Sequence, residues 1–139
     1  MVVEVALAML SREGRWLLQL RDDIVGIAAP GTWGLFGGHL DPGETAEQAL
    51  RRELVEEVAW QAGELEFWFT DINPQRIAHF FLAPLTVPLR ELRLLEGQDM
   101  ALASLQELGA GRVWSPQLGE HRPLAPSLQC AVQRLLAPE

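Results

Sequence analysis

Three glutamates share one face of a single predicted helix, and this spacing constrains the chain more than any other feature. Glu53, Glu56 and Glu57 stand at positions i, i+3 and i+4, which brings their side chains together on a helix surface. Like charges at this spacing repel one another, so the fold has to supply a compensating positive charge. Mg²⁺ prefers carboxylate oxygens and is bound through a few carboxylates together with substrate phosphates. The segment therefore predicts a helix that carries a divalent cation site.

The apolar residues of the same helix indicate where its acidic face lies. At roughly 100° per residue, Leu50, Leu54 and Val58 form an apolar stripe beside the edge that carries Glu53 and Glu57. A charge run that is only solvated would lie opposite the buried stripe. The adjacent placement instead favours a site at the edge of a cleft.

A glycine-rich loop precedes this helix, and the spacing across both segments resembles a known signature. Gly38 is followed by five residues, Glu44, seven residues, Arg52-Glu53-Leu54, one residue and Glu56-Glu57. This pattern resembles the Nudix box of the Nudix hydrolases, which cleave nucleoside diphosphates linked to another group. The segments 17–22, 30–36 and 96–108 also look like those that flank the box in this family.

The resemblance has one gap, at the end of the box. The family places a glycine and an apolar residue after the paired glutamates, where this chain has Ala59 and Trp60. A glycine in the left-handed conformation commonly ends a helix. We therefore expect Ala59 to change the helix exit by extending the helix toward Gly63, and we expect the chemistry to survive.

The resemblance implies a role for each charged position of the box. The implied catalytic residues are Glu53, Glu56, Glu57, Arg52 and Glu44. The implied ligands of Mg²⁺, or alternatively Mn²⁺, are Glu53, Glu56 and Glu57 with a main-chain carbonyl of Gly37 or Gly38. Glu53 or Glu56 also orients or deprotonates the attacking water, and the sequence does not separate the ligand from the base. Arg52 is expected to form a positioning ion pair with Glu44 or Glu56, with direct phosphate contact as the alternative.

Two further sets of candidates come from outside the charged positions of the box. Members of the family often recruit an acidic residue from a later loop, and Glu96 matches best by position, ahead of Asp99 and Glu120. Substrate contacts are expected among a cation, a histidine and aromatic residues, because a diphosphate needs positive charge and a base can stack on a ring. These candidates are Arg21, His39, Trp33 and Phe36. His79 lies in an apolar strand and is expected to be a satisfied core histidine.

Composition and charge exclude several classes of protein. The chain has 139 residues, which predicts a single domain spanning residues 1–139, and its net charge of −8 argues against binding to a nucleic-acid backbone. No apolar run reaches the length of a membrane span, and no signal peptide is recognised. The single cysteine, Cys130, excludes an intrachain disulfide. We expect a cytoplasmic protein that acts on a small nucleotide, as a monomer or homodimer.

The pattern of apolar runs and turn residues predicts an α/β fold. It agrees with the α/β/α sandwich around a central mixed sheet that the resemblance implies. We expect strands at residues 2–10, 15–20, 32–36, 65–70 and 77–83, a Gly37-Gly38 turn, and helices at 102–108 and 124–136 besides that of the box. Ser104 with Glu107 is expected to cap the first of these two helices, and Ser127 the second.

Three hypotheses for the function are consistent with this resemblance. The favoured one is a metal-dependent pyrophosphohydrolase acting on a nucleoside triphosphate, including oxidised ones, because the short chain looks like that branch of the family. The alternatives are an ADP-ribose or nucleotide-sugar pyrophosphatase and, from another class, a non-catalytic nucleotide sensor. The isomerase branch uses a catalytic cysteine, and Cys130 falls far from any matching segment.

Overall fold

The computed structural model of the chain describes residues 2–138, which form two compact units. The first unit comprises the chain up to Ser11 together with Phe36–Leu95, and the second comprises Arg12–Leu35 together with the chain from Glu96 onward. Each unit is built from two separate stretches of sequence.

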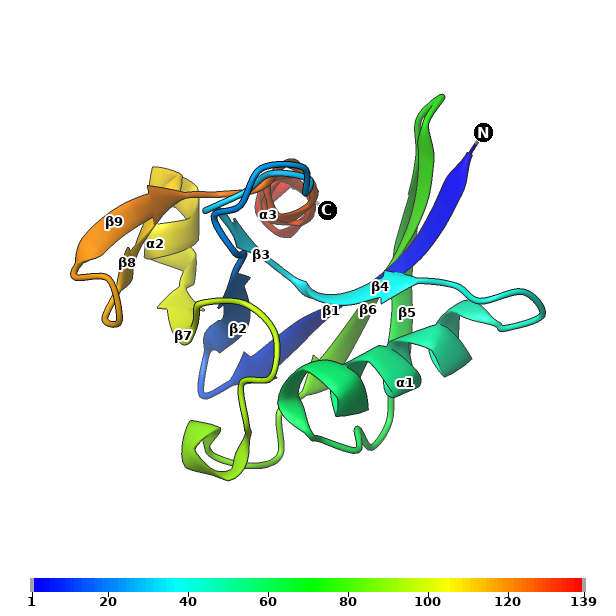
Figure 1. Cartoon of the computed structure of the whole chain (residues 1–139), viewed down its shortest axis with the longest axis horizontal. Coiled ribbons are helices and arrows are strands. Elements are labelled where there is room, and N and C mark those ends of the chain that lie inside the picture. The colour runs from blue at the N-terminus through cyan, green and yellow to red at the C-terminus, as the bar shows by residue number, and fades with distance from the viewer. Residues whose placement is uncertain (1, 139) are drawn as a thin grey trace. The chain divides into compact units, whose positions relative to one another are not determined.

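A mixed sheet forms the centre of the first unit (Figure 1). The strand β1 pairs in parallel with β6, from Val3 opposite Arg76 to Ser11 opposite Pro84. Antiparallel pairing adds β4 to the other side of β1 and adds β5 to β6. Residues 5–10 of β1 are all buried, as expected for a central strand covered on both faces. The strands are β1 (Val3–Arg12), β4 (Phe36–His39), β5 (Glu66–Ile72) and β6 (Arg76–Pro84).

The helix of the first unit, α1 (Ala46–Val58), begins at a capping box. The Thr45 side chain accepts a hydrogen bond from the Gln48 backbone N–H, and the Gln48 side chain accepts one from the Thr45 N–H. The predicted stripe of Leu50, Leu54 and Val58 is fully buried. The helix is thus held at its start by the cap and along its length by its apolar face.

The expected extension of this helix toward Gly63 is wrong. Helix α1 ends at Val58, and Ala59 itself takes the left-handed conformation, with φ 56° and ψ 41°. The Ala59 N–H donates to the carbonyl oxygen of Val55 at 3.0 Å, and the Trp60 N–H donates to that of Leu54 at 3.5 Å. The position that glycine fills in the family therefore keeps its conformation here without the glycine.

The expected Gly37-Gly38 turn is also wrong, because both residues lie inside the strand β4. Gly37 pairs with Leu7 and Gly38 with Ala6 on β1. Gly37 has φ 134°, and a methyl group there would lie 2.0 Å from the Ala6 carbonyl oxygen. Glycine is required at this position because two backbones approach closely, and not because the chain turns.

The chain that follows β6 returns to the end of α1. After the short 3₁₀ helix η1 (Leu89–Glu91), the Arg93 N–H donates to the Val58 carbonyl at 3.0 Å and the Leu95 N–H donates to the Glu57 carbonyl at 2.8 Å. The last carbonyls of a helix have no partner within it. This segment supplies those partners.

The second unit contains an antiparallel sheet, a hairpin and two helices. The strand β2 pairs with β3 on one side and β7 on the other, while β8 pairs with β9. These elements are β2 (Arg15–Leu20), β3 (Trp33–Gly34), β7 (Asp99–Ser104), α2 (Leu105–Ala110), β8 (Arg112–Ser115), β9 (Glu120–Pro123) and α3 (Pro126–Leu136).

Three expectations for this unit need correction. The strand expected at 32–36 is two strands, β3 and β4, that pair with different partners. Residues 102–104 belong to β7, although the Ser104–Glu107 capping box is confirmed at the start of α2. Helix α3 has Ala125 and not Ser127 at its N-cap, because Pro126 takes the first helical position.

Neither α1 nor any other helix in residues 2–138 is both long enough and apolar enough to cross a membrane.

Candidate active site

The glycine pair of β4 makes room for the carboxylates of α1. A methyl group on Gly38 would lie 2.7 Å from the carboxyl carbon of Glu53 and within 2.9 Å of both its oxygens. The Glu53 side chain is 16% exposed, so its carboxylate occupies the space that a larger residue at 38 would fill. The motif spacing therefore places two residues without side chains, Gly37 and Gly38, against the acidic face of the helix.

Glu57 is the most deeply placed carboxylate of the helix. It is only 4% exposed, and its Oε1 accepts a hydrogen bond from the Gly37 N–H at 2.8 Å. A buried carboxylate is costly unless it is hydrogen-bonded or paired. The fold thus holds Glu57 in one orientation beside the glycine pair, while Glu56 is 55% exposed.

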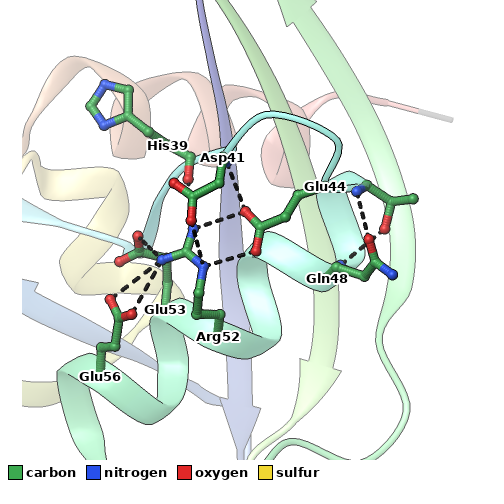
Figure 2. A network of polar contacts seen from close by, with 8 residues as sticks. His39, Asp41, Glu44, Gln48, Arg52, Glu53 and Glu56 are labelled. Carbon is green, nitrogen blue, oxygen red and sulfur yellow. Dashed lines mark hydrogen bonds and ion pairs between the residues drawn. The ribbon is translucent and has the colours of Figure 1, made fainter.

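Arg52 lies at the centre of the charged residues, as Figure 2 shows. Its Nε and Nη2 donate to the two carboxylate oxygens of Glu44 at 2.8 and 2.9 Å. Its Nη1 donates to Glu53 at 3.0 Å and to Glu56 at 3.3 and 3.4 Å. Both ion-pair partners expected for Arg52 are therefore present, and Glu53 is a third.

This network changes the acid–base properties of its members. The Arg52 hydrogen bonds, followed by the Asp41 N–H, lower the pKa of Glu44 from 4.5 to about 2. The pKa of Arg52 is raised, chiefly by its hydrogen bonds to Glu44. Asp41 was not among the expected site residues, although its carboxylate also lies 3.4 Å from Arg52 Nε. Its place in the loop between the box glycine and Glu44 was the available signal.

The carboxylate oxygens on this helix face are suitable ligands for a hard divalent cation. Carboxylate oxygens of Glu53, Glu56 and Glu57 are the ligands that Mg²⁺ prefers, and two of these glutamates flank the glycine pair. Within residues 2–138, however, no three acidic, histidine or cysteine side chains converge as ligands of one ion do. Arg52 contacts two of the three carboxylates, Glu53 and Glu56.

The candidates for a further acidic residue belong to the second unit and differ in what holds them. Asp99 accepts from the Ser115 hydroxyl at 2.7 Å and from the Gln117 N–H at 3.2 Å, so it anchors the turn between β8 and β9. Glu120 lies 3.0 Å from Arg122. Glu96 is exposed and follows directly after Leu95, whose N–H binds the Glu57 carbonyl. Glu96 stays a prediction.

The expected substrate contacts do not all fit the structure. Trp33 and Phe36 are fully buried, and the Trp33 indole N–H donates to the Val113 carbonyl at 2.9 Å, so the expectation that these rings stack on a base is wrong. Arg21 is half-buried and its Nε donates to the Ala28 carbonyl at 2.8 Å. The His39 side chain is exposed, and its carbonyl accepts from Arg52.

His79 joins three strands of the first unit instead of lying in the core. Its Nδ1 is 2.9 Å from the Thr70 hydroxyl on β5, and its Nε2 is 2.5 Å from Glu4 Oε2 on β1. It is a satisfied histidine, as expected, but one on a partly exposed stretch of the sheet.

Two sequence comparisons with known proteins match large parts of the chain. A family model described as the NUDIX domain matches residues 2–119. Among curated proteins, the nucleoside triphosphatase NudI of an Escherichia coli O1:K1 strain is 40% identical over 66 residues, which are 48% of this chain and 43% of that protein. The chain therefore spans less than half the length of the curated relatives it matches.

Solved structures agree on the fold. A MutT NUDIX hydrolase from Burkholderia pseudomallei has a TM-score of 0.74 at 22% identity, covering 97% of this chain and 98% of that one. The NUDIX domain of Shewanella oneidensis NrtR, solved with ADP ribose, has a TM-score of 0.67 at 18% identity, covering 97% and 85%. These likenesses confirm the mixed α/β fold.

Proposed function

The chain belongs to the Nudix family, and we propose that it is a metal-dependent pyrophosphohydrolase. Its substrate is a nucleoside diphosphate linked to another group, with a nucleoside triphosphate, oxidised or not, favoured. The observation that carries the proposal is the complete charged set of the motif, with Glu53 and Glu57 both set against the glycine pair.

The residues that would hold the metal are Glu53, Glu56 and Glu57, together with a main-chain carbonyl of Gly37 or Gly38. A bound Mg²⁺ or Mn²⁺ supplies charge neutralisation on the phosphate oxygens and lowers the pKa of a bound water. In this structure Glu44 pairs with Arg52, and Arg52 in turn pairs with Glu53 and Glu56. Whether Glu96 joins this set stays part of the proposal.

The burial of the three carboxylates supports different roles for them. Glu57 is buried and already accepts a hydrogen bond from Gly37, which suits a fixed ligand. A general base has to reach a water molecule and exchange a proton with solvent. Glu53 and Glu56 are more exposed, so the base is one of these two.

The choice of substrate rests on a relative. NudI is by name a nucleoside triphosphatase, and it shares 40% identity with this chain over 66 residues. The alternatives are an ADP-ribose or nucleotide-sugar pyrophosphatase and a non-catalytic nucleotide sensor. An assay of phosphate release coupled to pyrophosphatase, run over triphosphates, ADP-ribose, nucleotide sugars and dinucleoside polyphosphates, separates them. A kcat/KM tenfold higher for ADP-ribose or a nucleotide sugar than for every triphosphate refutes the favoured substrate.

The role of the carboxylates is tested by replacing Glu57 with glutamine. Glu57→Gln keeps the shape of the side chain and removes its charge, so the rate should fall by about a hundredfold or more, since metal-assisted charge stabilisation supplies several kcal/mol. Glu47→Gln is a matched control, because Glu47 lies on the same helix and pairs with Arg51 at its outer flank. Wild-type turnover in Glu57→Gln, or full activity in excess EDTA, contradicts the proposal.

A further inference from the structure

We propose that Arg52 acts as an exchangeable counter-ion of the metal site. In the metal-free protein its Nη1 group pairs with Glu53 and Glu56, and a divalent cation has to displace it from both. Its other edge stays on Glu44 throughout. The inference rests on the proposed function, since it concerns the same carboxylates.

The two edges of the Arg52 guanidinium are bound very differently. The edge formed by Nε and Nη2 meets both oxygens of Glu44 at 2.8 and 2.9 Å, and Nη2 also donates to the His39 carbonyl at 3.0 Å. Two parallel hydrogen bonds between arginine and carboxylate are the strongest form of this pair. Glu44 therefore anchors Arg52 independently of the metal ligands.

The remaining nitrogen, Nη1, is divided between two carboxylates. It lies 3.0 Å from Glu53 Oε1 and 3.3 and 3.4 Å from the oxygens of Glu56, so one NH₂ group is shared between the two carboxylates (Figure 2). The Glu56 side chain is half exposed, and ion pairs in contact with solvent are weak. These contacts are the ones that a divalent cation can replace.

The exchange explains why the ligands do not converge. Glu53 and Glu56 both turn to Arg52, while Glu57 is bound to the Gly37 N–H. No three such ligands in the described chain surround a common point. A cation that brings Glu53 and Glu56 together must compete with Nη1, so Arg52 lowers the affinity of the free protein for metal.

Calorimetric titration of the 139-residue chain with MnCl₂, and separately with MgCl₂, tests this competition. Arg52→Gln should bind three- to tenfold more tightly than the wild type, equal to about 0.6–1.4 kcal/mol. This is the range expected for an exposed ion pair with Glu56 together with a less exposed one with Glu53. Arg51→Gln removes the neighbouring charge, which pairs with Glu47 and the Ala62 carbonyl, and should change the Kd less than about twofold.

A charge-balanced variant separates displacement from net charge. The double variant Glu44→Gln/Arg52→Gln has the net charge of the wild type and should still bind metal more tightly than the wild type. Binding no tighter than the wild type in either Arg52→Gln or the double variant, with the fold intact by circular dichroism, overturns the inference. Where Arg52→Gln fails to fold, Arg52→Lys retains the charge without the two-edged geometry. That variant should show a smaller gain in affinity, and no gain counts against the inference.

The same titrations keep the two proposals apart. A wild type that binds neither cation overturns the proposed function and the inference together. A wild type that binds metal and hydrolyses nucleotide, while Arg52→Gln binds metal no more tightly, overturns the inference alone. A structure with Mn²⁺ bound should show Nη1 beyond hydrogen-bond distance of Glu53, more than about 3.5 Å away, with Nε and Nη2 still on Glu44.

Discussion

The helix exit at Ala59 stores strain that a single substitution should remove. Ala59 has φ 56° and ψ 41°, a conformation that costs an L-residue roughly 1–2 kcal/mol and glycine very little. Against this, glycine gives the unfolded chain more freedom, which costs about 0.4–1 kcal/mol. The difference between the mid-points of these ranges predicts that Ala59→Gly stabilises the protein by about 0.8 kcal/mol.

Urea denaturation followed by circular dichroism measures this change as a higher transition midpoint at an unchanged m-value. For a chain of this size the melting temperature should rise by roughly 3 °C. The backbone hydrogen bonds from residue 59 to Val55 and from Trp60 to Leu54 do not depend on the side chain at 59, so they should persist.

A nearby alanine provides the control. Ala62 is not among the residues with positive φ in the described chain, so Ala62→Gly adds unfolded-state freedom without relieving strain. It should lose about 0.4–1 kcal/mol. An Ala59→Gly variant no more stable than the wild type, or one that loses as much as Ala62→Gly, would refute the strain argument.

Three other perturbations have defined outcomes. Gly38→Ala should fold but lose activity, because the added methyl group meets the movable Glu53 carboxylate and displaces it. Gly37→Ala should fail to give soluble folded protein, because its methyl group would lie 2.0 Å from the Ala6 backbone oxygen. If both variants fold equally well and have equal activity, this explanation is wrong. The lowered pKa of Glu44 means that its ionised form stabilises the folded protein above about pH 4.5 and that this contribution is lost as the pH falls through about 2. The difference in unfolding free energy between wild type and Glu44→Gln should therefore narrow across that window, and a constant difference contradicts the assignment. His79→Ala removes the contacts with Thr70 and Glu4 that join β1, β5 and β6. The free energy of unfolding in urea should fall by about 1–2 kcal/mol while nucleotide hydrolysis is retained. An unchanged free energy of unfolding would show that these contacts do not stabilise the sheet.

The charged part of the candidate site could be predicted from sequence because its determinants are local. Helical periodicity sets which side of the apolar stripe Glu53 and Glu57 occupy, and the spacing of Glu44 and Arg52 matches the observed ion pair. The capping box of Ser104 and Glu107 is equally local. No contact from elsewhere in the chain is needed to recognise these features.

The errors arose where distant pairing decides the structure. Gly37 and Gly38 look like a turn by composition, yet pairing with β1 makes them a strand. Trp33 looks available to stack on a base, but its indole N–H is bound by the carbonyl of Val113, eighty residues along the chain. Local preference is overridden by such tertiary partners, which a single sequence does not reveal.

The strands β8 and β9 were missed for a different reason. Each has only four residues, and β9 reads Glu-His-Arg-Pro, with no run of branched or aromatic residues to indicate a strand. The pairing is instead supported by the turn that Asp99 holds through Ser115 and Gln117. A carboxylate that looked like a candidate ligand is thus part of what builds a hairpin.

The last turn of α1 has a consequence for how the helix itself is held together. Two of the acidic residues lie at its C-terminal end, and no basic side chain lies in that turn. The peptide dipoles of a helix place partial negative charge at the same end, so these glutamates oppose helix formation. The N–H groups of Arg93 and Leu95 supply the positive partners that a lysine would otherwise provide. A peptide spanning residues 44–60 should accordingly have little helix in water despite its N-terminal cap. The proposed metal ligands would then share one helix face only once the segment that contains Arg93 and Leu95 has folded against the helix end.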